Sequence, residues 1–496
     1  MNAELEMKLT IDKNSLKKLM GLDLVKSKTI AKSKKTQKLI NVYYDTPSYK
    51  LTKAGMVYRI RQNGVKYEAT IKTETAAYGG FSERNEFTLP VSEPVPPIEA
   101  FAQTGLEVDL RELMDGEELQ VLFSMEVNRE LRLLQVTKKT VIEMANDVGQ
   151  IVVGAQKLKI VETELEIKSG NKADLLEYAA QIAAAVPCFV ETRSKFARGL
   201  SLLDNSTENV LEEKKPRIDY KGTAKKEFLA LFAFYADRCL RIINLLKADA
   251  TLQSGADKLI LPCLLKLQAL LALTSPLLCK AEAEKMQKSL TELIKPLQEM
   301  QQYGLYIKQW QSIESLLGNK LVKSGMAVEL LKRKAAQEQA FVAQVQDGLY
   351  TRNLFRFLAY SEKSKWQKAE YVIAEQLLVS RLQDWHEQLV ALAVDKGSGE
   401  PQMRKMLDLV EKMVYVYQSI AKSSKIFKNA KRETLEDLYK KLFVLHYEVY
   451  SAKALRGLSE REHGLNWQRD IGLILGWRLR MYKETVKELL EAYKKI

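Results

Sequence analysis

Charged and apolar residues alternate with a period of two near both ends of the first 200 residues. The two segments read Glu4-Leu5-Glu6-Met7-Lys8-Leu9 and Glu162-Thr163-Glu164-Leu165-Glu166-Ile167-Lys168. In a β-strand this alternation puts all the carboxylates on one face and the apolar side chains on the other. One such segment would fit an ordinary strand with its charges in water. Two of them, together with the similar pattern around Arg59 and Arg61, indicate a face built for anions and metals.

Short, partly alternating runs separated by turn residues such as Pro47, Gly55 and Gly64 fill much of the same region. They predict strands at 39–44, 56–62, 67–72, 84–89, 126–134, 141–144 and 150–153. Helices are expected from near Asn14 and over 172–185. Many antiparallel strands in one domain predict a barrel or a sandwich.

Apolar residues recur at helical spacing almost without pause from about residue 221 to the C-terminus. One example is the set Ala374, Leu377, Leu378, Leu382, Trp385 and Leu389, which lies on one face of a helix. The run 259–278 is long enough to cross a membrane, but Pro262, Lys266 and Pro276 interrupt it. It therefore predicts a buried helix, and no membrane partner is expected.

These patterns divide the 496 residues into three parts. We predict an α+β protein with an antiparallel β-barrel at 1–203, a polar linker at 204–220 and an all-α helical bundle at 221–496. The net charge of +14 lies almost wholly beyond residue 210. That excess indicates an anionic partner for the bundle or a solvated basic surface.

Four cysteines lie far apart in the sequence: Cys188, Cys239, Cys263 and Cys279. Their spacing fits neither a zinc cluster nor a disulfide framework, so a reducing cytoplasm is the expected setting.

If the charged faces of the predicted strands point into a closed barrel, the interior of the barrel is charged and not apolar. Buried charges must pair with each other or with ligands. Carboxylates bind hard divalent cations such as Mg²⁺ or Mn²⁺, and Arg and Lys side chains bind phosphate oxygens. Acids and bases on facing walls therefore suit a metal-bound polyanion.

An ordered series of motifs over residues 1–203 resembles the CYTH domain, also called the triphosphate tunnel metalloenzymes. In chain order the motifs are Glu4-x-Glu6-x-Lys8, Tyr43-Tyr44-Asp45-Thr46-Pro47, Arg59-x-Arg61, Lys72, Gly79-Gly80-Phe81-Ser82-Glu83-Arg84-Asn85-Glu86, Arg129, Asp147-Val148-Gly149, Glu162-x-Glu164-x-Glu166-x-Lys168 and Ser194-Lys195-Phe196-Ala197-Arg198-Gly199.

The resemblance implies a barrel of about eight strands around a tunnel and assigns roles to its charged residues. The implied metal ligands are Glu4, Glu6, Asp147, Glu162, Glu164 and Glu166. The implied triphosphate ligands are Lys8, Arg59, Arg61, Lys72, Arg129 and Lys195, with Glu86 at a further acidic position of the tunnel. Among these, Glu4, Glu6, Lys8, Arg59, Arg61 and Lys72 are the candidate catalytic residues. The alternative for each residue is a salt bridge that lines the barrel.

The helical half resembles, more faintly, the CHAD domain, whose members bind polyphosphate. The segment 257–267 matches the first CHAD repeat but lacks its histidine and its run of arginines, and 432–447 approximates the second. Polyphosphate is therefore a candidate partner of the basic helical half.

Together these resemblances predict a cytoplasmic, Mg²⁺- or Mn²⁺-dependent enzyme that hydrolyses inorganic triphosphate to pyrophosphate and phosphate. The alternatives are another triphosphate in the same tunnel (ATP, thiamine triphosphate, or ATP cyclised to cyclic AMP) or a non-catalytic polyphosphate-binding protein. Nucleic acid is not an expected partner.

Overall fold

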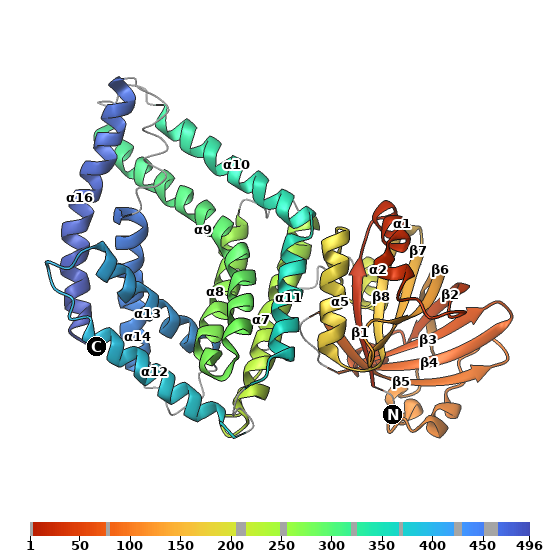
Figure 1. Ribbon diagram of the computed structural model, residues 1–496. Helices are drawn as coiled ribbons and strands as arrows, with labels where there is room; N and C mark the ends of the chain where they lie inside the picture. The colour runs from red at the N-terminus through yellow and green to blue at the C-terminus, as the bar shows by residue number, and fades with distance from the viewer. Residues whose placement is uncertain are drawn as a thin grey trace. The chain divides into compact units, whose positions relative to one another are not determined.

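The computed structural model describes residues 3–75, 80–204, 215–248, 255–318, 325–366, 371–420, 429–450 and 465–496 (Figure 1). The chain forms two compact units, each built from more than one stretch of sequence. The first comprises Met1–Lys214, Leu240–Ala248 and Val345–Lys363, and the second Lys215–Cys239, Asp249–Gln344 and Ser364–Ile496.

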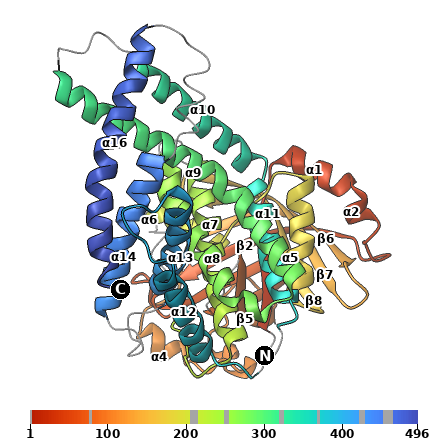
Figure 2. The same ribbon diagram turned by 60° about the vertical axis from the view of Figure 1, so that its left-hand side comes forward.

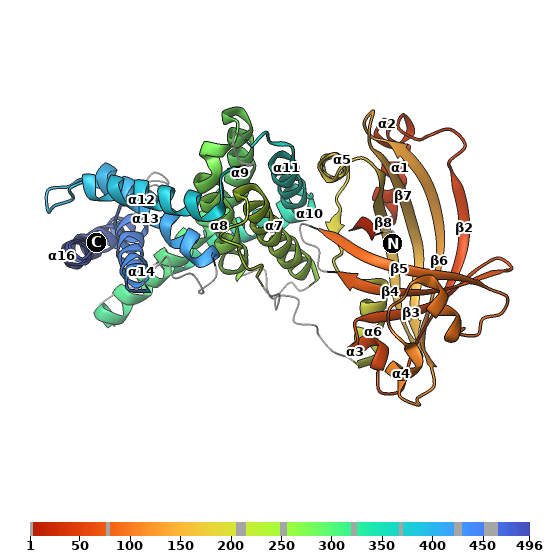
Figure 3. The same cartoon turned by 90° about the horizontal axis from the view of Figure 1, so that it is seen from below.

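Antiparallel strands of the first unit close into a barrel, which Figure 3 shows from below. The strands are β1 (Ala3–Thr10), β2 (Lys35–Asp45), β3 (Met56–Asn63), β4 (Lys66–Thr75), β5 (Phe81–Val91), β6 (Gln120–Gln135), β7 (Val141–Val153), β8 (Gln156–Ser169) and β9 (Phe189–Val190). Their order is β5-β4-β3-β2-β6-β7-β8-β1-β9, and β1 also pairs with β5. Eight strands thus form the closed barrel that the sequence predicted, and β9 pairs with the end of β1.

One strand differs from its prediction. The runs 141–144 and 150–153 were predicted as separate strands, but both belong to the continuous strand β7. The polar residues Asn146 and Asp147 between them are buried in the strand. Gly149, two residues later, has no room for a side chain: a Cβ there would lie 1.9 Å from the backbone oxygen of Glu126 on β6. Glycine here permits close approach of two strands and does not mark a turn.

Short helices close the ends and flanks of the barrel. They are α1 (Lys13–Gly21), α2 (Asp23–Lys26), α3 (Lys50–Lys53), η1 (Glu99–Thr104), α4 (Leu110–Met114), α5 (Lys172–Ala185) and α6 (Lys195–Asp204). Apolar clusters hold four of them to the strands: one around Tyr58, Ile71 and Phe101 joins α3, η1 and α4, and another around Phe123 and Phe196 joins α6.

Asp45, in the motif after β2, is fully buried and has a structural role. Its carboxylate accepts hydrogen bonds from the backbone N–H groups of Thr46, Leu51 and Thr52, at 2.7–2.9 Å. These bonds satisfy amide groups at the start of α3. Asp45 therefore fixes the chain reversal after β2.

Helix α5 is buried on almost every side, which requires a cover on the side away from the sheet. Helix α11 (Leu349–Lys363) packs against it, as Figures 1 and 2 show. Lys363 lies 3.3 Å from Asp174, and Lys172 lies 3.6 Å from Glu362. The compact unit of the barrel therefore includes residues beyond 203. Most of the predicted linker, 205–214, lies outside the described residues.

Helices make up the second unit, as the sequence predicted (Figure 2). In chain order its helices are α7 (Ala224–Ala248), α8 (Ala256–Thr274), η3 (Ser275–Leu277), α9 (Lys280–Leu317), α10 (Met326–Gln346), α12 (Ala374–Ala391), α13 (Glu400–Ser419), α14 (Asn429–Val444), the π-helical turn η5 (Leu445–Tyr450) and α16 (Leu465–Tyr493). The end of α7 from Leu240 and the end of α10 from Val345 belong to the first unit.

Helix α8 contains the apolar run noted in the sequence and packs against α9 and α13. In the part of the chain that the structure describes, only the segment Ala256–Leu277 has the length and hydropathy of a membrane span, and 61% of its apolar 18-residue window is buried inside the fold. A core helix of a bundle has the same composition.

The cover over α5 leads to a prediction about truncation. A chain that ends at residue 214 lacks α11, so α5 should lose its apolar cover and exchange its amide hydrogens faster. Hydrogen exchange followed by mass spectrometry checks this, with β6 and β7 as internal reference strands that should stay protected. Equal protection of α5 in the truncated and full chains would show that the barrel folds without α11.

Candidate active site

The strand register brings the acidic residues of β1, β7 and β8 together. Lys8 pairs with Glu164 and Glu6 with Glu166 across β1 and β8. Asp147 on β7 lies between Glu162 on β8 and Arg129 on β6. Because alternate residues of a strand share a face, the period-two pattern of the sequence becomes one charged wall inside the barrel.

Ion pairs compensate the carboxylates of this wall. The Arg129 guanidinium donates to Asp147 Oδ1 at 2.7 Å and to Oδ2 at 2.6 Å, and also to Glu164 Oε2 at 2.7 Å. The Lys195 ammonium lies 2.8 Å from Asp147 Oδ2 and 2.7 Å from Glu164 Oε1, and it also pairs with Glu162. Thus Arg129 and Lys195, two of the expected substrate ligands, lie against the carboxylates.

These cations keep the carboxylates ionised. Burial opposes ionisation of Glu164, but Lys195 and Arg129 outweigh it and hold the pKa of Glu164 well below its usual range. Burial also opposes ionisation of Asp147, and the same two cations lower its pKa. For Glu6, Lys8 at 2.6 Å outweighs the cost of burial and lowers the pKa. Carboxylates with lowered pKa values are poor proton acceptors at neutral pH but good ligands for cations.

Arg59 and Arg61 on β3 form the opposite side of the barrel interior. Arg59 donates to Thr70 Oγ1 at 3.3 Å, and Arg61 donates to Asn41 Oδ1 at 2.9 Å. Among the described residues, neither guanidinium has a carboxylate within 4 Å, and Arg59 Nε is buried without a hydrogen-bond partner. These two side chains therefore have unused capacity to bind an anion.

The pKa of Arg61 reflects this shortage of negative charge. Burial, followed by the nearby charges of Arg59 and Arg129, lowers it to about 9, and the weaker attraction of Glu68 does not compensate. Arg61 is still charged at neutral pH. Each like-charge contact is unfavourable, and an anion placed between the guanidinium groups would relieve it.

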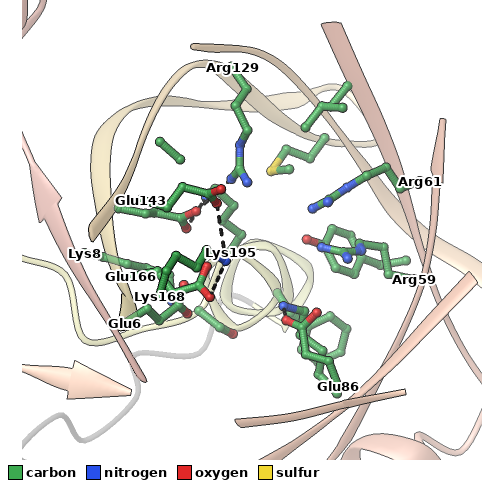
Figure 4. A pocket seen from close by; sticks show the side chains of 18 residues that line it. Glu6, Lys8, Arg59, Arg61, Glu86, Arg129, Glu143, Glu166, Lys168 and Lys195 are labelled. Atoms are coloured by element: carbon green, nitrogen blue, oxygen red, sulfur yellow. Dashed lines mark hydrogen bonds and ion pairs between the residues drawn. The ribbon is translucent and has the colours of Figure 1, made fainter. Parts of the chain in front are cut away.

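A cavity of about 200 Å³ lies between the two sides. Figure 4 shows Arg59 and Arg61 pointing into it from one side, and Glu6, Lys8, Glu143, Glu166 and Lys168 lying on the other. Seven basic and five acidic side chains line it among the described residues: Lys8, Arg59, Arg61, Lys72, Arg129, Lys168 and Lys195, with Glu6, Glu86, Glu143, Glu164 and Glu166. The excess of basic groups favours an anionic ligand.

The remaining predicted site residues are placed as follows. Lys72 and Glu86 face each other across β4 and β5 and form an ion pair at the cavity wall. Glu166 pairs with Lys168 at 2.6 Å. Glu4 belongs to β1, but its side chain lies outside the part that the structure describes.

Three charged residues were missing from the predicted site. Glu143 lines the cavity, and its spacing of four from Asp147 on one strand was the available signal. Lys168 also lines the cavity and ends the alternating segment of β8. Arg198 is buried, and its Nη2 donates to Glu162 Oε2 at 2.6 Å. It lies three residues after Lys195, which on a helix places both side chains toward the same wall.

Three carboxylates fit the ligand set of a hard divalent cation. Ligand oxygens of Asp147, Glu162 and Glu164 lie within 4.8 Å of one another. Oxygen donors in such a cluster suit Mg²⁺ or Mn²⁺. Glu6 is close enough to Glu164 for their charges to interact, so it borders the same cluster.

Comparison with known proteins identifies the first part of the chain. Residues 2–200 match the CYTH domain family, and the chain therefore carries a CYTH domain there. The chain is 34% identical over 162 residues to the inorganic triphosphatase of Haemophilus influenzae (strain ATCC 51907 / DSM 11121 / KW20 / Rd). That match covers 33% of this chain and 45% of the relative, so it spans less than half of the relative's length.

Two solved structures are similar to part of the chain. A putative adenylyl cyclase from Hippeastrum, described as having a dominant triphosphatase activity, is 16% identical, with a TM-score of 0.29 over 42% of this chain and 98% of its own. The CHAD domain of Ricinus communis is 13% identical, with a TM-score of 0.46 over 57% of this chain and 96% of its own. With scores below 0.5, these likenesses identify neither an activity nor a ligand.

The Arg129–Asp147 pair provides a test of this wall. Arg129→Gln should lower the free energy of unfolding of the barrel by about 3 kcal/mol, because it leaves a buried carboxylate with fewer partners. Hydrogen exchange of β6 and β7 peptides measures this loss. The matched control is Arg111→Gln, whose two-bond pair with Glu99 is exposed and should contribute nothing measurable.

The effect of Arg129→Gln should also depend on pH. Asp147 and Glu164 have lower pKa values in the folded than in the unfolded state, where they are near 4. Their ion pairs therefore stabilise the fold above about pH 4, and this stabilisation is lost as the pH falls through the folded-state pKa values. The difference between wild type and Arg129→Gln should therefore be full at pH 7 and shrink in strong acid. A difference that grows toward acid pH contradicts the assignment.

Proposed function

We propose that the chain is a metal-dependent hydrolase that cleaves inorganic triphosphate into pyrophosphate and phosphate. The observation that carries the proposal is the pair Arg59 and Arg61, the first buried and the second partly buried. Within the part of the chain that the structure describes they have no carboxylate in ion-pair range, and they face a wall of carboxylates across one cavity. The CYTH domain and the identity to an inorganic triphosphatase support the same chemistry.

The two sides of the cavity bind different parts of the substrate complex, the phosphate oxygens and the metal ion. Arg59 and Arg61 bind and orient the phosphate oxygens, since guanidinium groups form paired hydrogen bonds to phosphate. Asp147, Glu162 and Glu164 would hold the divalent cation, with Glu6 beside them and Glu4 and Glu166 as further proposed ligands. When bound, a Mg²⁺ or Mn²⁺ ion neutralises phosphate charge and polarises the phosphorus–oxygen bonds.

In hydrolysis, a water oxygen forms a bond to a terminal phosphorus, and the bond between that phosphorus and the bridging oxygen breaks, so that phosphate and pyrophosphate are released. Charge develops on the phosphate oxygens during this step, so buried cations that are already in place stabilise the transition state. Arg59, Arg61, Lys8 and Lys72 are proposed to supply that charge. Because the fold already holds them there, little reorganisation is needed.

The helical unit and the cellular setting extend the proposal. Its excess of Lys and Arg supports polyphosphate as a second ligand, held by screened electrostatic contacts that weaken with salt. The four cysteines form no disulfide within the described residues, which supports work in the reducing cytoplasm.

An assay panel decides the substrate. Full-length protein should hydrolyse inorganic triphosphate faster than ATP, thiamine triphosphate or long polyphosphate, and should form no cyclic AMP from ATP. A stronger activity on another member of the panel would transfer the assignment to that substrate. No activity on any of them, with metal present, would leave only the binding role.

The carboxylate side is tested with Glu6→Gln, which keeps the shape and removes the charge. We expect turnover to fall by about 100-fold or more, the scale of losing one electrostatic contact in an active site, and this loss should be far larger than any effect on folding, which the melting temperature measures. Excess chelator should abolish wild-type activity. Glu126→Gln, on the exposed face of β6, is the control and should match wild type, and undiminished activity in Glu6→Gln would falsify the role of Glu6.

The arginine side is tested with two substitutions of Arg59. Arg59→Ala should lower kcat/KM by about 100- to 1000-fold, and Arg59→Lys should recover only part of this, since Lys cannot form the two-bond contact to phosphate. Steady-state kinetics with inorganic triphosphate measures both. If both variants match wild type, Arg59 has only a structural role.

A further inference from the structure

The ammonium of Lys195 lies among the three carboxylates that could hold a metal ion. Lys195 is the first residue of α6, and its Nζ pairs with Asp147, Glu162 and Glu164. The oxygens of these residues also form the group within 4.8 Å. One side chain of the protein therefore contacts all three carboxylates of this cluster, Asp147, Glu162 and Glu164.

An ammonium group and a divalent cation cannot use these oxygens at once. Mg²⁺ binds oxygen ligands at about 2.0–2.1 Å, so an ion held by these carboxylates would compete with the ammonium for the same oxygens. Two positive charges at such close range repel strongly in a buried site. Binding of the metal therefore requires Lys195 to leave at least part of the cluster.

Helix α6 can stay in place while the Lys195 side chain moves. Arg198, one turn further on, bonds the outer oxygen of Glu162, Oε2, at 2.6 Å. Ser194 Oγ accepts from the N–H of Ala197 at 2.9 Å and caps the helix. A Cβ on Gly199 would lie 2.3 Å from the Phe123 ring, so α6 lies directly against the barrel wall. The Lys195 side chain, by contrast, has four rotatable bonds.

We propose that Lys195 is an internal cation that competes with the metal for Asp147, Glu162 and Glu164, and that Arg198 is a positioning residue that holds Glu162 for either occupant. Lys195 also lines the cavity that faces Arg59 and Arg61. A displaced ammonium can therefore turn toward a phosphate oxygen there. Metal and triphosphate then bind cooperatively, because each stabilises the arrangement that the other requires.

This inference rests on the proposed metal site, and its test measures binding instead of turnover. Mn²⁺ is titrated into the full-length protein without triphosphate, and free Mn²⁺ is followed by electron paramagnetic resonance. Lys195→Met removes the competing cation and should bind Mn²⁺ at least about 10-fold more tightly than wild type. Lys195→Arg, whose planar group holds carboxylates more firmly, should bind Mn²⁺ more weakly.

Arg198→Met is the matched control, because it removes a neighbouring buried cation whose ion pair, among the described residues, is with the outer oxygen of Glu162. It should weaken Mn²⁺ binding, the opposite direction to Lys195→Met. Lys195→Arg keeps the charge balance of the wall, so it remains informative if Lys195→Met does not fold. Triphosphate should also raise the Mn²⁺ affinity of wild type more than that of Lys195→Met.

The outcomes separate this inference from the proposed function. Suppose that wild type binds Mn²⁺. If Lys195→Met then binds Mn²⁺ equally or more weakly, competition by Lys195 is overturned and the metal site stands. The same conclusion follows if Lys195→Arg binds Mn²⁺ more tightly than wild type. If wild type, Lys195→Met and Glu164→Gln all fail to bind Mn²⁺, the metal site is overturned and the inference with it.

Discussion

Burial of charge inside a closed barrel is the constraint on which the rest of this site depends. An unpaired buried charge is costly, so each one needs a partner of opposite sign or a ligand. On the wall formed by β6, β7 and β8 the partners come from the protein itself. Arg129 and Lys195 together contact Asp147, Glu162 and Glu164, and the low pKa values of Asp147 and Glu164 follow from these contacts.

The opposite side of the cavity differs, because its two arginines have no carboxylate in ion-pair range among the described residues. This difference between the two sides determines which kind of ligand the barrel can bind. Among the residues that the structure describes, the bonds of Arg59 and Arg61 go to neutral oxygens, those of Thr70 and Asn41. A barrel built for stability alone would pair these guanidinium groups with carboxylates. Arg59 and Arg61 thus face carboxylates that are already paired with Arg129 and Lys195. A metal-bound phosphate anion in the cavity would supply the two guanidinium groups with a partner.

Packing outside the barrel supports the same wall. Helix α5 follows directly after β8, the strand of Glu162 and Glu164, and it is buried between the strands and α11. Residues far along the chain thus complete the compact unit that holds the site. Stability of the site therefore depends on sequence that contributes no charged group to the cavity.

Much of this protein could be predicted from the sequence because its strands alternate strictly. The alternation on β1, β3 and β8 places Glu6, Arg59 and Glu164 each on the charged face of its strand, and helical spacing beyond residue 221 predicts the bundle. Only the tertiary structure decided that β7 runs unbroken through Gly149, that Arg129 and Lys195 contact carboxylates, and that α11 joins the barrel unit. Periodicity records which face a side chain occupies, whereas contacts between distant segments depend on register and packing, which local patterns do not encode.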